Sequence, residues 1–317
     1  MFNPIIKIRI NEKMFYFLFL TLVCLLLYGQ KYKTQISVIY TNSANGYLES
    51  CDCPTLPYGG LARRITVINK LRSKNTIVVD SGDLLSAEEN RLLTEYCLKL
   101  AKYCDYDAVN VGDQEIIQGL NFVKQFKDIP FVSANVLINK SDEESYFFPL
   151  YKIKEVNNIK IAIVGIVSSD TLTLIDNNVL SNIKIVNHID CLNKLIPLLN
   201  KQADIVVLLS HCGLEEDKRI AKQIEGINII VSGHSQNLLF QPLKIGSTLI
   251  VQAGKNGSYV GKLDLEVVKT NKRIKIDKYK NKLVLLDKNV FVDKMVQEII
   301  NEYNYKIKKQ AEKLLLK

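Results

Sequence analysis

The sequence predicts an α/β fold in which helices flank two β-sheets, and two patterns predict it. Short apolar runs rich in Val and Ile alternate with stretches whose apolar residues recur every three or four positions, as in amphipathic helices. Five of the apolar runs end in short polar clusters, which is typical of strands that deliver side chains to one edge of an α/β sheet. The length of 317 residues and the 47% hydrophobic content allow a full core.

The strands and helices are expected in a regular order. In the first half the predicted strands are residues 36–40, 76–80, 108–111 and 131–136, and the predicted helices are 61–71, 92–103 and 121–126. Strands at 160–166, 205–209 and 227–231 and helices at 189–199 and 217–224 continue the alternation. Alternating strands at 248–252, 261–268 and 273–279 then indicate an antiparallel closing region, and a charged amphipathic helix at 292–316 comes last.

Three segments are predicted: a signal peptide or N-terminal membrane anchor at 1–30, one domain at 31–280 and the C-terminal amphipathic helix within 281–317. Three basic residues before position 14 precede an apolar run at 14–28, which has the shape of a secretory signal. The run is short for a transmembrane helix, but an uncleaved segment would hold the protein at a membrane. The domain is therefore expected outside the cytoplasm, in the periplasm or the extracellular space.

The charge of the chain argues against a nucleic-acid partner. The formal net charge is +9, from 42 Lys and Arg against 33 Asp and Glu, and much of the excess lies near the two ends. No basic stripe interleaved with aromatic residues tracks along the sequence, as a nucleic-acid surface would require. An anionic substrate or a negatively charged membrane surface fits this charge better.

Two of the three histidines, His211 and His234, lie directly after predicted strands. Polar clusters at the same edge are Thr41 to Gly46, Gly82-Asp83 and Gly112-Asp113-Gln114-Glu115. Imidazole together with carboxylate is a ligand set for Zn, Mn or Fe, so this series predicts a metal site. The alternative is that the two histidines are hydrogen-bonded caps of their strands. His188, the third histidine, follows no strand and is expected on the surface.

This series of clusters resembles the calcineurin-like metallophosphoesterases, and in particular the catalytic domain of the 5′-nucleotidase family. Residues 131–136 and 252–257 also look like segments of that family, and the resemblance covers roughly residues 35–270. It implies a four-layer double β-sheet flanked by helices over 31–280. It also implies a secreted or periplasmic enzyme that uses two metal ions to hydrolyse phosphate esters of nucleotides and similar compounds.

The resemblance assigns roles to individual residues. Asp83 would bridge both metals, and His211 and His234 would hold the second metal together with Asp113, which stands where the family has asparagine. Gln236 matches a ligand of the first metal. The first motif departs from the family, because Ser43 and Asn45 replace its Asp and His, which leaves Asn45 as a weak ligand. One firmly bound divalent ion is therefore expected more readily than two.

The catalytic histidine of the family is replaced here by Gln114. The amide cannot transfer a proton, and the loss of general-acid catalysis typically costs about 10²–10⁴-fold in rate. Gln114 could still donate a hydrogen bond to a phosphate. Together with Ser43 and Asn45, Gln114 favours the alternative that the chain no longer hydrolyses its ligand.

The loop after the first motif contains Cys51 and Cys53. They could supply thiolate ligands to a changed metal site, together with Cys212, or one of them could form a disulfide with Cys97 or Cys104 in an oxidising compartment. Arg63 and Arg64 follow in the next helix. They could contact a substrate phosphate, or they could be solvated or paired with carboxylates.

The sequence therefore predicts an exported, metal-dependent phosphoesterase with a modified metal site, acting on a small phosphorylated substrate such as a nucleotide. A first alternative is a member that has lost hydrolysis and binds a metal or another ligand. A second is a thiol or redox protein that uses Cys51 and Cys53.

Overall fold

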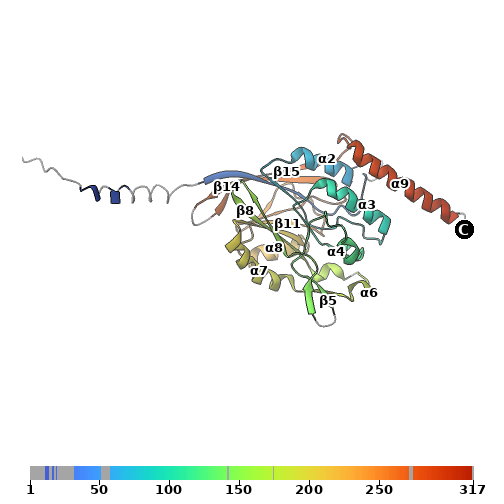
Figure 1. Ribbon diagram of the computed structural model, residues 1–317, viewed down its shortest axis with the longest axis horizontal. Coiled ribbons are helices and arrows are strands. Elements are labelled where there is room, and N and C mark those ends of the chain that lie inside the picture. Colours follow the sequence, from blue (N-terminus) through green and yellow to red (C-terminus); the bar gives the residue numbers. More distant parts are fainter. Residues whose placement is uncertain are drawn as a thin grey trace, which may run out of the picture.

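The computed structural model describes residues 11–13, 16, 17, 19, 32–50, 58–140, 143–173, 175–270 and 274–315. Two six-stranded sheets pack face to face, and helices cover both outer faces (Figure 1). The predicted α/β sandwich of four layers is therefore confirmed.

The first sheet has the strand order β15-β14-β1-β2-β3-β4. Strands β1 to β4 are parallel, whereas β14 and β15 pair antiparallel at one edge. The bounds are β1 Tyr32–Thr41, β2 Thr76–Asp80, β3 Ala108–Asn110, β4 Phe131–Val132, β14 Tyr259–Lys269 and β15 Ile274–Leu285.

The second sheet has the order β12-β13-β11-β10-β8-β7, with four parallel strands between two antiparallel edges. The bounds are β7 Tyr151–Val156, β8 Ile159–Val167, β10 Ile205–His211, β11 Ile229–Ser232, β12 Leu243–Ile245 and β13 Thr248–Val251. A third, small sheet joins β5 Val136–Lys140, β6 Glu143–Tyr146 and β9 Ile183–Ile185. The buried runs of β10 and β11 fit this position, because parallel strands covered on both faces are apolar throughout.

Helices α2, α3 and α9 cover the first sheet, and α7 and α8 cover the second (Figure 1). The first third of α9 is anchored by the buried Val296 and Ile300, and Tyr303 stacks against Tyr96 of α3. The helices span α2 Leu61–Leu71, α3 Arg91–Ala101, α4 Asp113–Ile117, α5 Leu120–Val123, α6 Asn177–Leu180, α7 His188–Gln202, α8 Leu214–Gln223 and α9 Lys294–Leu315.

Some elements differ from those predicted. Strand β7 was not predicted, because its largely exposed, lysine-containing segment lacks a clear apolar alternation. The single strand predicted at 131–136 is instead two: β4 ends at Val132, and Val136 begins β5 of the small sheet, which was not predicted. Strand β15 runs to Leu285, past the predicted domain end at residue 280, because its largely exposed residues resemble a loop in sequence. Helix α4 was missed because it has only five residues.

Most of the predicted signal or anchor segment lies outside the described residues. Among the helices that the structure does describe, none is both long enough and apolar enough to cross a bilayer. The assignment of residues 1–30 therefore stays a prediction.

Asp217 of α8 is fully buried behind the ends of β10 and β11. Burial raises the pKa of its carboxyl to about 7, although the hydroxyls of Ser210 and Ser232 oppose the shift. A carboxyl with a raised pKa contributes stability below its unfolded pKa of about 4 that is lost as the pH rises through the folded value. The folded protein is therefore more stable when the carboxyl of Asp217 is neutral than when it is charged.

We therefore expect Asp217→Asn to be more stable than the natural protein at pH 8, by up to a few kcal/mol since each pKa unit corresponds to about 1.4 kcal/mol. At pH 4 the two proteins should differ much less. Urea unfolding at both pH values measures this, with the exposed Glu225→Gln as the control. An equal effect of Asp217→Asn on stability at pH 4 and pH 8 would contradict the raised pKa of Asp217.

Candidate metal centre

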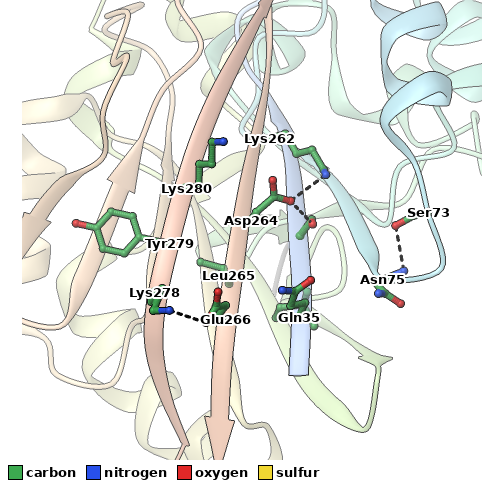
Figure 2. Close-up of a pocket in the computed structure, with 12 residues that line it drawn as sticks. Gln35, Ser73, Asn75, Lys262, Asp264, Leu265, Glu266, Lys278, Tyr279 and Lys280 are labelled. Atoms are coloured by element: carbon green, nitrogen blue, oxygen red, sulfur yellow. Dashed lines mark hydrogen bonds and ion pairs between the residues drawn. The ribbon is translucent and has the colours of Figure 1, made fainter. Parts of the chain in front are cut away.

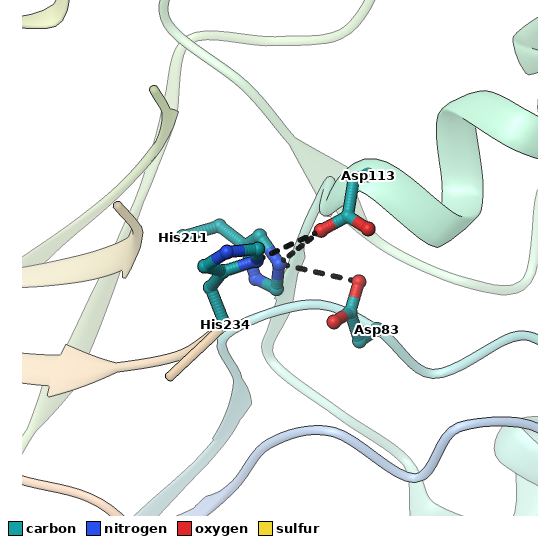
Figure 3. A group of neighbouring side chains, drawn as sticks. All are labelled: Asp83, Asp113, His211 and His234. Carbon is teal, nitrogen blue, oxygen red and sulfur yellow. Dashed lines mark hydrogen bonds and ion pairs between the residues drawn. The ribbon is translucent and has the colours of Figure 1, made fainter. Parts of the chain in front are cut away.

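Four side chains converge at the carboxyl ends of the parallel strands (Figure 3). Asp83 follows β2, Asp113 begins α4 just after β3, His211 ends β10 and His234 follows β11. One ligand atom from each lies within 4.8 Å of the others, so a single ion could contact all four. The two sheets therefore contribute two carboxylates and two imidazoles to one place.

His211 is fully buried, and its ring is fixed by three contacts. Its Nδ1 lies 2.9 Å from the carbonyl oxygen of Ser81, which can only accept, so Nδ1 carries the proton. Its Nε2 lies 2.8 Å from Asp113 Oδ1 and 3.2 Å from Asp83 Oδ1. In the neutral ring Nε2 bears a lone pair, which would repel both carboxylates unless a proton or a metal cation lies between them. This geometry fits a metal ligand oriented by its backbone contact.

The electrostatics of the cluster favour a cation as well. Burial disfavours a charged His211, but Asp83 and Asp113 outweigh it and raise the pKa of the imidazole well above its usual value. Burial also raises the pKa of Asp83. Asp113 is buried to a lesser degree, and its hydrogen bonds with His211 and His234 lower the pKa of its carboxyl far below the usual range. A divalent ion would replace the shared proton and neutralise both carboxylates.

His234 is the accessible member of the cluster. Its Nδ1 lies 3.2 Å from Asp113 Oδ1, and its side chain is 39% exposed. Its backbone is in the left-handed region, as are those of Asp83, Gln236, Asn45 and Ser43. Non-glycine residues in this region cost energy and cluster at functional sites, where the surrounding structure enforces them. These left-handed turns direct the side chains toward one another, whereas regular strand ends would not bring them together.

Glycines let the loops approach His211 closely. A Cβ on Gly233 would lie 2.8 Å from His211 Nδ1, and one on Gly112 would lie 2.5 Å from Asp83 Oδ1. Real Cβ atoms do not tolerate such distances, so these two positions require glycine. The Gly-Asp and Gly-His pairs of the sequence are thus explained by packing around one imidazole.

Glu115 is a site residue that the sequence did not single out. Its carboxylate accepts hydrogen bonds from the backbone N–H groups of Asp83, Leu84 and Leu85, and from Gly112. Burial and the charge of Asp83 raise its pKa to about 7. Because it ties the loop of Asp83 to the start of α4, Glu115 positions both carboxylate ligands. In the sequence, the one indication of this role is that Glu115 belongs to the polar cluster Gly112 to Glu115.

The predicted first metal position contains an amide network. Gln114 Nε2 donates to Asn45 Oδ1 at 3.0 Å, and Asn45 Nδ2 donates to Asn256 Oδ1 at 2.7 Å. Ser43 is buried and its hydroxyl has no partner among the described residues. Gln236 lies two residues beyond His234 and lines a cavity beside it. The side chain of Asn45 is therefore hydrogen-bonded to the side-chain amides of Gln114 and Asn256. Its contact with a metal ion stays a prediction.

The prediction that Arg64 contacts a substrate phosphate is wrong. Arg64 is fully buried and forms an ion pair with Asp80 at 2.9 Å, because it lies on the face of α2 that packs against the sheet. Its guanidinium also donates to the carbonyl oxygen of Asn42. Arg63 is half-buried and its guanidinium lies 3.5 Å from the carbonyl oxygen of Leu286, so a phosphate contact by Arg63 remains a prediction.

The cysteine predictions are partly testable. Cys51 and Cys53 lie outside the described residues. Cys97 and Cys104 are buried free thiols, so the predicted disulfide to either of them is not formed. Burial raises the pKa of Cys104 to about 12 and that of Cys212 well above its usual value. Cys212 is not among the described side chains that converge with His211 in the candidate metal cluster.

His188 is also placed differently from the prediction. It is buried at the start of α7, and its Nε2 lies 2.9 Å from Glu216 Oε1. The two other histidines therefore remain the candidates for metal binding.

Comparison with known proteins identifies chains of similar sequence and similar fold. No family model matches the chain. A 5′-nucleotidase of Diplobatis ommata is 26% identical over 319 residues, which covers 90% of this chain and 54% of that protein. A 5′-nucleotidase precursor from Thermus thermophilus superposes with a TM-score of 0.76 at 23% identity, covering 87% of this chain and 59% of that one. The calcineurin-like phosphoesterase YfkN from Bacillus subtilis gives a TM-score of 0.71 at 21% identity, covering 87% of this chain and 98% of that one.

The fold is therefore that of the calcineurin-like metallophosphoesterases, with a candidate metal centre at the edge where the strands of both sheets end. Within that class the chain is similar in sequence to 5′-nucleotidases, and the resemblance predicted above is confirmed. The chain spans about half the length of the curated relatives it matches.

Proposed function

We propose that this chain is a metal-dependent phosphoesterase that hydrolyses phosphate monoesters, nucleotides among them, with one firmly bound divalent ion. The observation that carries the proposal is the buried Nε2 of His211, which faces the carboxylates of Asp83 and Asp113 within 3.2 Å. That arrangement favours a metal ion, which would replace the proton that the three groups otherwise share, and the 5′-nucleotidases that resemble the chain supply the reaction class.

The ion would be held by Asp83, Asp113, His211 and His234, a donor set that suits Zn, Mn or Fe. Such an ion polarises a phosphate oxygen and lowers the pKa of a bound water. A second ion at the predicted first position would meet mainly amides, from Gln236 and Asn45. Amide oxygens are weak donors for these metals, which is why we propose one tightly bound ion.

Gln114 takes the place of the family's catalytic histidine in this proposal. Its Nε2 donates to Asn45, and its Oε1 is buried without a partner among the described residues. The side chain can orient a phosphate by hydrogen bonding but cannot protonate a leaving group. Hydrolysis would therefore be fastest for esters whose leaving group departs without a proton.

We further propose that the protein is exported, to the periplasm or the extracellular space. The basic residues and the apolar run before residue 30 support this. The same segment would link the protein to a membrane if it is not cleaved. No nucleic-acid partner is proposed, because the positive charge forms no continuous basic stripe.

The test is a titration of the metal-free protein with Mn²⁺ or Zn²⁺, coupled to hydrolysis of p-nitrophenyl phosphate. We expect turnover to rise and saturate at about one ion per chain. Saturation at about two ions would contradict the single-ion site. Metal binding without turnover would favour the alternative, a binding protein that has lost hydrolysis.

A further inference from the structure

We propose that the second half of α9, residues 304–315, docks on a negatively charged membrane surface. The proposal is independent of the metal centre, because none of the four candidate ligands lies on this helix. It assigns a partner to the part of α9 that the domain leaves uncovered.

Helix α9 packs on the domain only through its first part. Val296 and Ile300 are buried, whereas every residue from 307 to 315 is exposed. In Figure 1 this second part extends away from the sheets and from the helices that cover them. An isolated helix of so few residues is marginally stable in water, so burial of an apolar face against a partner would stabilise it.

The apolar stripe that anchors α9 continues past the edge of the domain. Its side chains follow one another at spacings of three, four and seven residues, which places them on one face of the helix: Val296, Ile300, Tyr303, Ile307 and Leu314. The domain covers the beginning of this stripe. Ile307 and Leu314 are 36% and 73% exposed, and the neighbouring Leu315 is 87% exposed. The far end of the stripe therefore has an apolar surface that the domain does not use.

Unpaired lysines flank this exposed end. Within the part of the chain that the structure describes, Lys308, Lys309 and Lys313 form no ion pair. Glu312 is the one acidic residue between positions 307 and 315, so the segment carries an excess of positive charge. An apolar stripe flanked by lysines is typical of helices that lie on anionic lipid surfaces.

Two other occupants fit these residues less well. A second copy of α9 on the stripe would bring its own lysines toward Lys308 and Lys309, and the like charges would repel. An acidic protein surface would satisfy the lysines but would leave Leu314 and Leu315 without apolar contacts. In a membrane the leucines can enter the lipid while the lysine stems reach back to the headgroups. Because α9 is not apolar enough to cross a bilayer, it would lie along the surface.

The lysines of the groove in Figure 2 differ from those of α9. The groove has a volume of about 520 Å³ and lies over β1, β14 and β15. Lys262 pairs there with Asp264, and Lys278 pairs with Glu266, so these charges are largely neutralised. Lys278 and Lys280 are exposed and provide control positions for the lysines of the helix.

The experiment measures amide hydrogen exchange of the full chain by mass spectrometry, alone, with phosphatidylcholine vesicles, and with vesicles of phosphatidylserine and phosphatidylcholine in equal parts. A local measurement is needed, because the N-terminal apolar run could bring the protein to either vesicle without involving α9. We expect the anionic vesicles to slow exchange of residues 304–315 by about tenfold or more, since each lysine near such a surface strengthens binding by about fivefold. Phosphatidylcholine alone should have little effect, and high salt should remove the protection because it screens the charges.

Two double variants of α9 separate the apolar contribution from the charge. Ile307→Gln with Leu314→Gln removes the exposed apolar side chains, and Lys308→Gln with Lys309→Gln removes most of the positive charge. Each should abolish the protection by anionic vesicles. All four side chains are exposed, so the fold should be retained, and circular dichroism checks this.

Two control variants change exposed residues away from α9. Leu198→Gln, at a side chain that is 52% exposed on α7, and Lys278→Gln with Lys280→Gln should both keep the protection. Equal protection by both kinds of vesicle, protection that survives either double substitution in α9, or no protection at all would overturn the proposal. Protection that appears without vesicles and grows with protein concentration would identify a second copy as the occupant and would overturn it as well.

Discussion

Replacing His211 with asparagine is expected to reduce the tightly bound metal from about one ion per chain to almost none. Turnover of a phosphate ester should fall by about 10³-fold or more, because the ion that activates water and phosphate is lost. His211 is the buried member of the cluster and faces both Asp83 and Asp113, so no neighbouring side chain can take its place. Metal analysis after dialysis and single-substrate kinetics measure both effects.

The other two histidines, His234 and His188, provide comparisons for the His211 variant. His234→Asn should lower metal affinity less than His211→Asn, because His234 is partly exposed and water can fill the vacated position. His188→Asn should leave metal content unchanged, because His188 pairs with Glu216 outside the cluster. Circular dichroism of each variant checks that the fold is retained. Equal metal content in folded His211→Asn and His188→Asn would refute the site.

The metal cluster could be predicted from the sequence because its geometry follows from local rules. Asp83, Asp113, His211 and His234 each come at or just after the carboxyl end of a parallel strand, and such ends meet at one edge. The glycines before three of them are a consequence of the same crowding. Strand ends in both sheets therefore carry enough information to bring these four candidate ligands together, though not to identify an ion.

Other parts of the site depend on contacts that are remote in the sequence. Glu115 is one carboxylate in a polar turn, and nothing local indicates that four backbone N–H groups point at it. Arg64 and Arg63 are adjacent in sequence, yet only Arg64 faces the core, where Asp80 binds it. The helical period places Arg64 on the apolar face with Leu61 and Ile68, so the sequence could have separated the two arginines. The ion pair of Arg64 with Asp80 could not be predicted, because the two residues are brought together only by the packing of α2 on the sheet.

Gln114→His is the second large effect expected. It places an imidazole at the position where the resemblance puts the family's catalytic histidine, and it should raise turnover of esters with poor leaving groups by about 10²-fold or more, within the range of general-acid catalysis. For p-nitrophenyl phosphate, whose leaving group needs little protonation, the gain should be much smaller. The ratio of the two rate changes is the measurement, because a change in metal affinity alone would scale both substrates equally.

Gln114→Asn is the matched control for this prediction. It keeps an amide at the position but shortens the side chain, so it should lose the contact with Asn45 and bring no gain in rate. Metal content must be measured in parallel, since loss of that contact frees Asn45 and could open the first metal position. A gain in Gln114→His that is equal for both leaving groups, or that follows a second bound ion, would mean that the imidazole acts as a ligand and not as an acid. A gain confined to poor leaving groups at constant metal content would identify proton transfer as the step that this chain lacks.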